Sequence, residues 1–373
     1  MSSVRPPQVA MDLSVLRQFN TGTEEFIEGL VGGLDQLGVS VIPLDVEQPL
    51  QPQQAQLGQK TRSKRSPAAK WFWESWGLAA ALRRTNADVV HIPYLAHPPR
   101  PLAVPAVVTV HDLIPYRFPH YQRRLRDRQY FRGLKAHLQY AARFVAISQA
   151  TREDLAIVFP DLGARTVVIP NGVHEDFYRP VPPAPVDALI AHGVLVSRPR
   201  LLYVGGYAVH KNVGILLRAA SRVLPRRDAE LVLIGAAHNP TVARLVATEH
   251  LERHVRITDR VSRAELRAWY ACSTAFCFPS RYEGFGLPPA QALAAGVPVV
   301  ASRTAALEEV LGEAALFAPP DDLDAWVHNL ERLLDDGVLR QRLAALGQTR
   351  AGSYHWAAVA AQYADVYREV ARS

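Results

Sequence analysis

Apolar and polar residues follow two distinct periods along this chain. Short β-branched runs, typical of buried strands, are separated by segments with apolar residues every three or four positions, typical of helices packed on one face. In the first half, strands are expected within 8–16, 39–45, 87–93, 105–113, 143–148 and 165–172, and helices within 24–38, 68–84 and 123–142. Regular alternation of strand and helix predicts a parallel sheet covered by helices on both faces.

The alternation starts again after a proline-rich break at 178–200, which has the composition of an interdomain linker. Strands are expected within 200–206, 229–235, 255–261, 274–280 and 297–302, and helices within 213–224, 240–251, 262–273, 289–295, 323–334 and 338–373. We therefore expect an α/β fold with two doubly wound, Rossmann-like domains, 1–180 and 181–355, and a last helix, 356–373, that returns to the first domain. In such sheets ligands bind beyond the carboxyl ends of the strands.

Composition narrows the class of protein. The chain has 373 residues and a net charge of +7, but the positive charge is spread along it without a common nucleic-acid-binding motif, so no nucleic-acid partner is expected. Its two cysteines, Cys272 and Cys277, lie in an apolar run and are expected to be buried thiols in a reducing compartment. Neither a secretory leader nor a membrane-spanning stretch is visible, which predicts a cytoplasmic protein, at most peripheral at the inner membrane face.

The segment 281–300, RYEGFGLPPAQALAAGVPVV, carries the densest candidate chemistry. It follows an expected strand, so its loop lies at the carboxyl edge of a sheet. Gly284 and Gly286 let the backbone approach a ligand, and the following helix N-terminus suits phosphate or sugar oxygens. Glu283 can accept hydrogen bonds from hydroxyl groups, and Gln291, about one turn into the helix, can face the same space. A glycine loop of this kind, taken alone, is more often a structural turn with a solvated glutamate.

The whole string resembles the signature of the retaining glycosyltransferases of family 4, in which two glutamates separated by seven residues precede a Gly-x-Pro-Val-Val strand. Further segments agree in order and spacing: TGTEEF, VVTVHDLIP, FVAISQATREDL, VVIPNGV, LLYVGGYAVHKN, LVLIG and ITDRVSRAELRAWY. The resemblance covers nearly the full chain. It implies the GT-B fold, in which two Rossmann-like domains face a cleft, with the acceptor in the N-terminal domain and the nucleotide sugar in the C-terminal one.

The resemblance also implies roles for residues on the donor side. Glu283 would hold hydroxyls of the donor sugar. Gln291 stands where the family has its second glutamate, which holds the ribose, and an amide loses the charge-assisted bond there. Lys211 matches one of two basic residues that clamp the donor diphosphate, although a lone lysine is also compatible with a solvated surface position. The second basic position is Gly206, so one phosphate charge is missing unless His210 or another residue replaces it. The remaining expected donor-site residues are Gly205, Val261, Phe285, Gly286 and Leu287.

On the acceptor side, His111 and Asp112 follow an expected strand. The resemblance implies that His111 lies beside the reacting sugar, whereas Asp112 could equally cap the following turn. Gly22 and Thr23 stand at the first strand–helix loop, where the family often has two glycines.

These features predict a retaining, metal-independent hexosyltransferase that moves a sugar, mannose being the first candidate, from an NDP-sugar to a saccharide or lipid-linked acceptor. No metal and no cofactor are expected beyond the NDP-sugar substrate, for which the resemblance suggests GDP-mannose. Because of Gly206 and Gln291, two alternatives stay open: a non-catalytic NDP-sugar-binding partner subunit and a sugar-nucleotide epimerase of similar architecture.

The segment 59–76, QKTRSKRSPAAKWFWESW, mixes basic and aromatic residues. It could rest on an anionic membrane and deliver a lipid-linked acceptor. The alternative, which we favour from the sequence, is a loop leading into a helix whose aromatic residues Trp71, Phe72, Trp73 and Trp76 pack inside the N-terminal domain.

Overall fold

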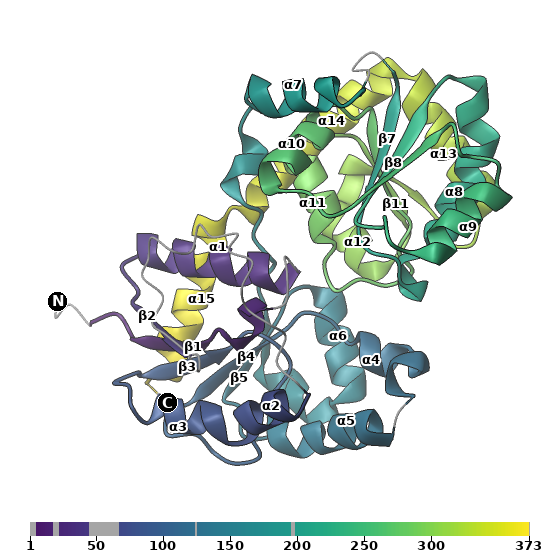
Figure 1. Ribbon diagram of the computed structural model, residues 1–373. Helices are drawn as coiled ribbons and strands as arrows, with labels where there is room; N and C mark the ends of the chain where they lie inside the picture. Colours follow the sequence, from purple (N-terminus) through teal and green to yellow (C-terminus); the bar gives the residue numbers. More distant parts are fainter. Residues whose placement is uncertain (1–4, 18–21, 45–66, 124, 195–197, 373) are drawn as a thin grey trace. The chain divides into compact units, whose positions relative to one another are not determined.

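The structure is a computed structural model that describes residues 5–17, 22–44, 67–123, 125–194 and 198–372 (Figure 1). It divides the chain into two compact units, each built on its own six-stranded sheet. Unit 1 comprises Met1–Gly172 and Tyr354–Ser373, and unit 2 comprises Val173–Ser353. The first boundary therefore falls at 172–173 instead of the expected 180–181, and the second at 353–354 instead of 355–356. The last helix belongs to unit 1.

The sheet of unit 1 is wholly parallel, in the order β2-β1-β3-β4-β5-β6. Its strands are β1 (Val9–Asp12), β2 (Val41–Leu44), β3 (Val89–Ile92), β4 (Ala106–Val110), β5 (Arg143–Ala146) and β6 (Thr166–Val168). Its helices are α1 (Gly22–Gln36), α2 (Pro67–Phe72), the π-helix η3 (Trp73–Gly77), α3 (Leu78–Leu82), α4 (Ile114–Arg117), α5 (Leu125–Leu138), α6 (Gln149–Val158) and α15 (Trp356–Val370).

Two hydrophobic cores, one on each face, explain why the strands of unit 1 are apolar at most positions instead of alternating between apolar and polar residues. Val9 and Met11 of β1 point to the core that contains α1 and α15, and Ala10 between them points to the core that contains η3, α3, α5 and α6. The alternation along the strand thus buries successive residues under different helices.

Helix α15 is joined to unit 1 by close packing and by a buried polar network. Trp356 and Ala360 lie against Gly29 and Gly33 of α1, where no room is left for a Cβ atom. His91 on β3 bonds through Nδ1 to the Tyr367 hydroxyl and through Nε2 to Thr109, both at 2.8 Å. Since the ring is fully buried, its pKa is lowered to about 3 and it stays neutral.

The expected helix over 68–84 is interrupted by one π-helical turn, η3. Trp73 is buried and lies over Gly77, where a Cβ would stand 2.5 Å from the ring. Trp71, Phe72 and Trp76, however, are 59%, 61% and 49% exposed. The expectation that these aromatic residues pack inside the domain is therefore wrong for three of the four, because the helix turns only one of its faces to the core. Residues 59–66 lie outside the described residues.

The sheet of unit 2 is also parallel, in the order β12-β11-β10-β7-β8-β9. Its strands are β7 (Arg200–Val204), β8 (Glu230–Ile234), β9 (Val255–Thr258), β10 (Ala275–Phe278), β11 (Val299–Ser302) and β12 (Ala315–Ala318). Its helices are α7 (Pro183–Ala191), α8 (Val213–Val223), α9 (Pro240–Thr248), α10 (Arg263–Ala271), α11 (Leu287–Ala294), α12 (Ala305–Leu311), α13 (Leu323–Asp335) and α14 (Gly337–Ala351). Strand β12 was not expected, and the supposed linker contains α7.

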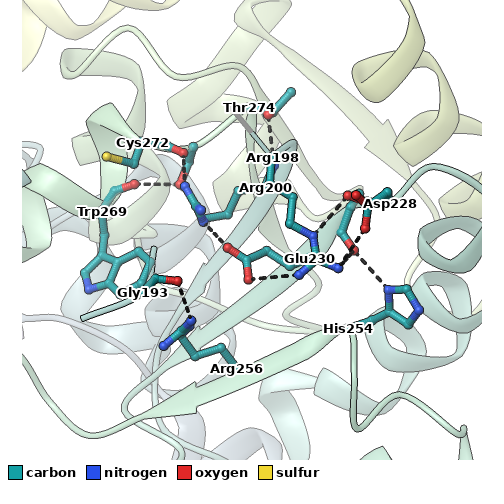
Figure 2. Close-up of polar contacts among 12 residues, drawn as sticks. Gly193, Arg198, Arg200, Asp228, Glu230, His254, Arg256, Trp269, Cys272 and Thr274 are labelled. Atoms are coloured by element: carbon teal, nitrogen blue, oxygen red, sulfur yellow. Dashed lines mark hydrogen bonds and ion pairs between the residues drawn. The ribbon is translucent and has the colours of Figure 1, made fainter. Parts of the chain in front are cut away.

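The amino ends of the unit 2 strands are held by a buried ion pair (Figure 2). Arg200, the first residue of β7, is fully buried and donates from Nε to Glu230, the first residue of β8, at 2.6 Å. Arg200 also donates to the carbonyl of Cys272, and Arg198 lies on the other side of the carboxylate at 3.7 Å. This edge is opposite to the carboxyl ends of the strands, so the network stabilises the sheet away from the ligand-binding loops.

Within the described ranges, every helix is too short or too polar to traverse a lipid bilayer. Both cysteines are buried free thiols, as expected.

Candidate active site

Two of the predicted donor-site residues form an ion pair at the carboxyl edge of the unit 2 sheet. Lys211, at the end of the loop after β7, places Nζ 2.7 Å from Oε1 of Glu283, in the loop after β10. The ammonium also lies 5.3 Å from the centre of the Phe278 ring. β7 and β10 are neighbours in the sheet, which is why two residues 72 positions apart in the sequence meet. Lys211 is therefore a paired, largely covered lysine and not a solvated surface residue, and its role at the donor site stays a prediction.

The glycine loop after β7 is shaped by Tyr203. Its buried hydroxyl donates to the carbonyl of Gly206 at 3.2 Å. A Cβ atom on Gly205 would stand 2.8 Å from the hydroxyl oxygen of Tyr203. Gly205 has a φ of 154°, which disfavours other residues. Burial, and then the nearby charge of Glu283, raise the pKa of Tyr203 far above its usual value, so the hydroxyl keeps its proton.

The N-terminus of α11 forms the other side of this loop cluster. Gly286 has a φ of 89° and precedes Leu287, the first helical residue, while a Cβ on Gly286 would lie 2.6 Å from Leu307. Pro288 and Pro289 occupy the first turn, where no intrahelical N–H is needed. Phe285 and Gln291 are buried. The local geometry that the sequence predicts for 284–296 is confirmed, including Gly296 after the helix with a φ of 71°.

A cavity of about 370 Å³ opens between the loops that follow β7, β8 and β9. It is lined by Tyr207, Gly235, Ala236, Ala237, His238, Asn239, Asp259 and Arg260. Val261 follows directly in the chain but does not line it. Sequence reasoning missed Asp259 and His238, whose Oδ2 and Nε2 atoms lie 3.0 Å apart at this cavity. A signal was available for His238, which follows the expected strand 229–235 at the ligand-binding edge. Asp259 was placed inside the expected strand 255–261, whereas β9 ends at Thr258.

In unit 1, His111 stands after β4 with its ring edge-on to Phe26, 4.9 Å between ring centres. Nε2 lies 3.0 Å from the carbonyl of Pro93. Since a carbonyl only accepts, Nε2 carries the proton and Nδ1 keeps its lone pair. Burial lowers the pKa of His111 to about 4, so the imidazole is neutral near pH 7.

The other predicted acceptor-side residues have simpler surroundings. Asp112 accepts a hydrogen bond from the N–H of Ile114 at 3.0 Å, which is the capping arrangement. Gly22 is the first residue of α1 and nothing lies within 4 Å of where its Cβ would be, so sterics do not require glycine there. Thr23 follows on the same turn and is half-buried.

Unit 1 also contains two buried carboxyl side chains that the sequence analysis did not single out. Asp12, at the carboxyl end of β1, is fully buried and accepts from Trp73 Nε1 at 3.1 Å and from the Tyr94 hydroxyl at 2.7 Å. Glu74 on η3 accepts from the Tyr130 hydroxyl at 3.2 Å. Desolvation raises the pKa of both carboxyl groups. Among the described residues, no three His, Cys, Asp or Glu side chains gather closely enough to hold a metal ion.

Comparison with known proteins identifies the family. Residues 20–177 match the family described as Glycosyltransferase Family 4, and residues 198–336 match Glycosyl transferases group 1. The O-antigen chain mannosyltransferase B of Escherichia coli is 30% identical over 295 residues, which is 78% of this chain and 76% of that protein. The MMP alpha-(1->4)-mannosyltransferase of Mycolicibacterium hassiacum is 33% identical over 231 residues, 60% of this chain and 53% of that protein.

Solved structures agree on the fold. The sucrose-phosphate synthase of Thermosynechococcus elongatus superposes with a TM-score of 0.80 at 21% identity, over 99% of this chain and 100% of that one. HepE of Anabaena, solved in complex with UDP-glucose, superposes with a TM-score of 0.72 at 15% identity, over 97% and 100% of the two chains. The chain belongs to the group 1, family 4 glycosyltransferases and has their two-domain GT-B fold. It is a glycosyltransferase, and neither the partner-subunit nor the epimerase alternative is favoured.

Proposed function

We propose that this protein transfers a hexosyl group, mannosyl first among the candidates, from a nucleoside diphosphate sugar to a saccharide or lipid-linked hydroxyl, with retention and without a metal. The observation that carries the proposal is the Lys211–Glu283 pair at 2.7 Å. It places a cation suited to a diphosphate beside a carboxylate suited to sugar hydroxyls. The mannosyltransferases among the relatives, and the UDP-glucose complex of HepE, support a nucleotide-sugar donor.

In the proposed reaction the Lys211–Glu283 contact loosens when the donor binds, and the ammonium of Lys211 contacts the donor diphosphate instead. Lys211 then neutralises the charge that grows on the leaving phosphate, which is the main catalytic demand of this chemistry. Glu283 accepts hydrogen bonds from the sugar and fixes its orientation. The N–H groups at the start of α11 supply the second phosphate contact that Gly206 lacks. Gln291 contributes an uncharged contact to the ribose.

On the acceptor side, we propose that His111 contacts the reacting sugar. A neutral imidazole with a free Nδ1 lone pair can accept a hydrogen bond from a hydroxyl without introducing a charge. Asp112 then acts by holding the turn that follows, as its bond to Ile114 suggests.

The test is a transfer assay with a panel of nucleotide sugars and saccharide acceptors, read by NDP release and by the anomeric signal of the product. We expect an α-linked product from an α-donor, unchanged activity in EDTA, and a fall of roughly 100-fold or more in kcat for Glu283→Gln and Lys211→Met. Arg342→Met, which removes an exposed positive charge on α14, is the control. An inverted product, loss of activity in EDTA, or full activity of Glu283→Gln would contradict the proposal.

A lipid-linked acceptor is favoured by a specific surface of unit 1. The exposed aromatic residues Trp71, Phe72 and Trp76 lie on the helical segment formed by α2 and η3. This segment contacts α5, because Tyr130 of α5 donates a hydrogen bond to Glu74 of η3. The exposed positions of α5 include the basic residues Arg128, Arg132 and Lys135. Aromatic side chains with neighbouring cations bind anionic bilayer surfaces.

We therefore expect the protein to sediment with vesicles of phosphatidylcholine and phosphatidylglycerol and not with phosphatidylcholine alone. Replacing Trp71 and Phe72 by serine should abolish sedimentation and leave transfer to a water-soluble acceptor unchanged. Equal sedimentation of the wild type and this double variant would refute the membrane contact.

A further inference from the structure

The loop that follows β12, residues 319–322 (the β12 loop), contacts the loop that carries Lys211, although two strands separate β12 from β7 in the sheet. Asn212, the next residue after Lys211, donates from Nδ2 to the carbonyl of Pro320 at 2.8 Å. Asn212 is half-buried and has a φ of 52°, a left-handed conformation that residues other than glycine keep only where their surroundings hold it. The contact therefore fixes the main chain directly after Lys211.

The β12 loop also holds the segment that carries Glu283. The guanidinium of Arg281 forms a bidentate ion pair with Asp321, in which Nη1 lies 2.8 Å from Oδ2 and Nη2 contacts Oδ1. The N–H of Arg281 donates to the carbonyl of His210 at 2.7 Å, so the main chain near Glu283 meets the main chain beside Lys211. The β12 loop thus connects the two segments whose side chains form the pair at 2.7 Å.

The β12 loop is itself well supported. The carbonyl of Pro319 accepts a hydrogen bond from Nε1 of Trp326, a fully buried side chain, at 3.2 Å. Asp322 caps the first turn of α13. The rings of Pro319 and Pro320 restrict the backbone between these two contacts. The loop can therefore act as a fixed support for the segments that it touches.

We propose, resting on the proposed function, that Asn212, Arg281 and Asp321 are positioning residues. They set the spacing between the ammonium of Lys211 and the carboxylate of Glu283. The ammonium must meet the leaving diphosphate while the carboxylate holds the sugar, and a displacement of about 1 Å in such a geometry can cost on the order of 100-fold in rate. Because the charge on the leaving phosphate grows only in the transition state, loss of this spacing should lower kcat and leave KM for the donor nearly unchanged.

The test measures steady-state transfer and thermal unfolding of variants of the full chain. Asp321→Asn should lower kcat by roughly 3- to 5-fold, the range that an exposed ion pair can contribute. Its Tm should change by less than about 1 °C, since the Asp321 side chain is 71% exposed. Asp321→Glu keeps the carboxylate and should stay within about 2-fold of the wild type. Asn212→Gly keeps the left-handed backbone, removes the bond to Pro320 and should lower kcat by roughly 5- to 10-fold.

The double variant Asn212→Gly with Asp321→Asn separates positioning from stability. The spacing of the two segments depends on both contacts, so after the first substitution the second should lower kcat by no more than about 2-fold further, while the changes in Tm add. Asp324→Asn, three residues along the chain, breaks an exposed ion pair of 2.9 Å with Arg222 on α8. It is the matched control and should behave as the wild type.

Hydrogen exchange without substrate reports the contacts themselves. Peptides from 207–213 and 281–287 should exchange faster in Asn212→Gly and in Asp321→Asn, and at the wild-type rate in Asp324→Asn. Unchanged exchange in the first two variants would show that the β12 loop does not hold these segments, and would overturn the inference.

Undiminished kcat in both single variants would also overturn the inference, as would kcat losses that multiply in the double variant. The proposed function is judged on the wild type alone. Transfer from an NDP-sugar that is equally fast in the wild type and in the single variants would refute positioning and leave glycosyl transfer intact. A wild type that turns over no NDP-sugar would refute both.

Discussion

The contact between α1 and α15 can be tested by two adjacent, chemically identical substitutions with opposite expected effects. Gly32 and Gly33 both lie inside α1, so replacing either by alanine should stabilise the helix by about 1 kcal/mol. At Gly32 nothing lies within 4 Å of the new Cβ. Gly32→Ala should therefore stabilise unit 1 by about that amount.

At Gly33 the new Cβ would stand 2.6 Å from Cβ of Ala360 and 3.0 Å from the carbonyl oxygen of Trp356. Neither neighbour can rotate away, because one is the first atom of its side chain and the other is backbone. The helices must separate, and overpacking of a buried contact costs about 1–3 kcal/mol. If the overpacking cost is about 3 kcal/mol and the gain in helix propensity about 1 kcal/mol, Gly33→Ala should destabilise unit 1 by about 2 kcal/mol.

Differential scanning calorimetry measures the effect, since about 1 kcal/mol shifts Tm by roughly 2–4 °C for a unit of this size. Gly32→Ala should raise the transition of unit 1 by a few degrees and Gly33→Ala should lower it by more. Hydrogen exchange of peptides from 356–370 should accelerate only in Gly33→Ala. Equal shifts of the same sign in both variants would refute the packing of α15 on α1 and the reasoning built on it.

Three further predictions concern the buried polar groups and the site. The pKa of His91 is lowered to about 3 in the folded protein, so the unfolded chain binds this proton first. The contribution of His91 to the free energy of unfolding is full above its unfolded pKa of about 6.5 and falls by about 2 kcal/mol as the pH drops to 5. In urea unfolding, His91→Gln should therefore make the fall of stability with pH smaller by about that amount, while the buried His111 keeps its own share. Arg200→Met should cost about 3–5 kcal/mol in the same assay, because it removes the cation 2.6 Å from the buried carboxylate of Glu230 and leaves only Arg198 at 3.7 Å, whereas Arg200→Met with Glu230→Leu should cost less. Tyr203→Phe should leave the Tm near that of the wild type and raise KM for the nucleotide sugar more than it lowers kcat. The reason is that the hydroxyl positions Gly206 and does not contact the reacting atoms. An unchanged KM would argue against this role.

Much of the fold follows from local spacing in the sequence. Eleven of the twelve strands in the described ranges were expected, because β-branched runs between helical segments are recognisable within a window of a few residues. Strand β12, with the sequence ALFA, was missed because four apolar residues without a β-branched side chain fit a helix as well as a strand. Helix α7 was missed because its prolines signal a break, although prolines also suit the first turn of a helix.

The candidate site also has one part that the sequence predicts and one part that depends on the tertiary structure. The loop at 283–291 was predictable, because its glycines, prolines and helix lie next to one another in the chain. The Lys211–Glu283 pair and the cavity at Asp259 were not, since each depends on which strands become neighbours. The family resemblance supplied roles for residues such as His111 and Gln291, and those roles stay predictions until variants are measured.

The sequence by itself determined the parallel α/β architecture and the loop that carries Glu283, because both rest on periodicity and turn chemistry within short segments. The tertiary structure decided what local patterns cannot express. It turned Trp73 inward and Trp71 outward on one helix, since only one face of that helix meets a core. It also decided where the returning last helix packs, because Gly29 and Gly33 of α1 leave the space that Trp356 and Ala360 of α15 fill.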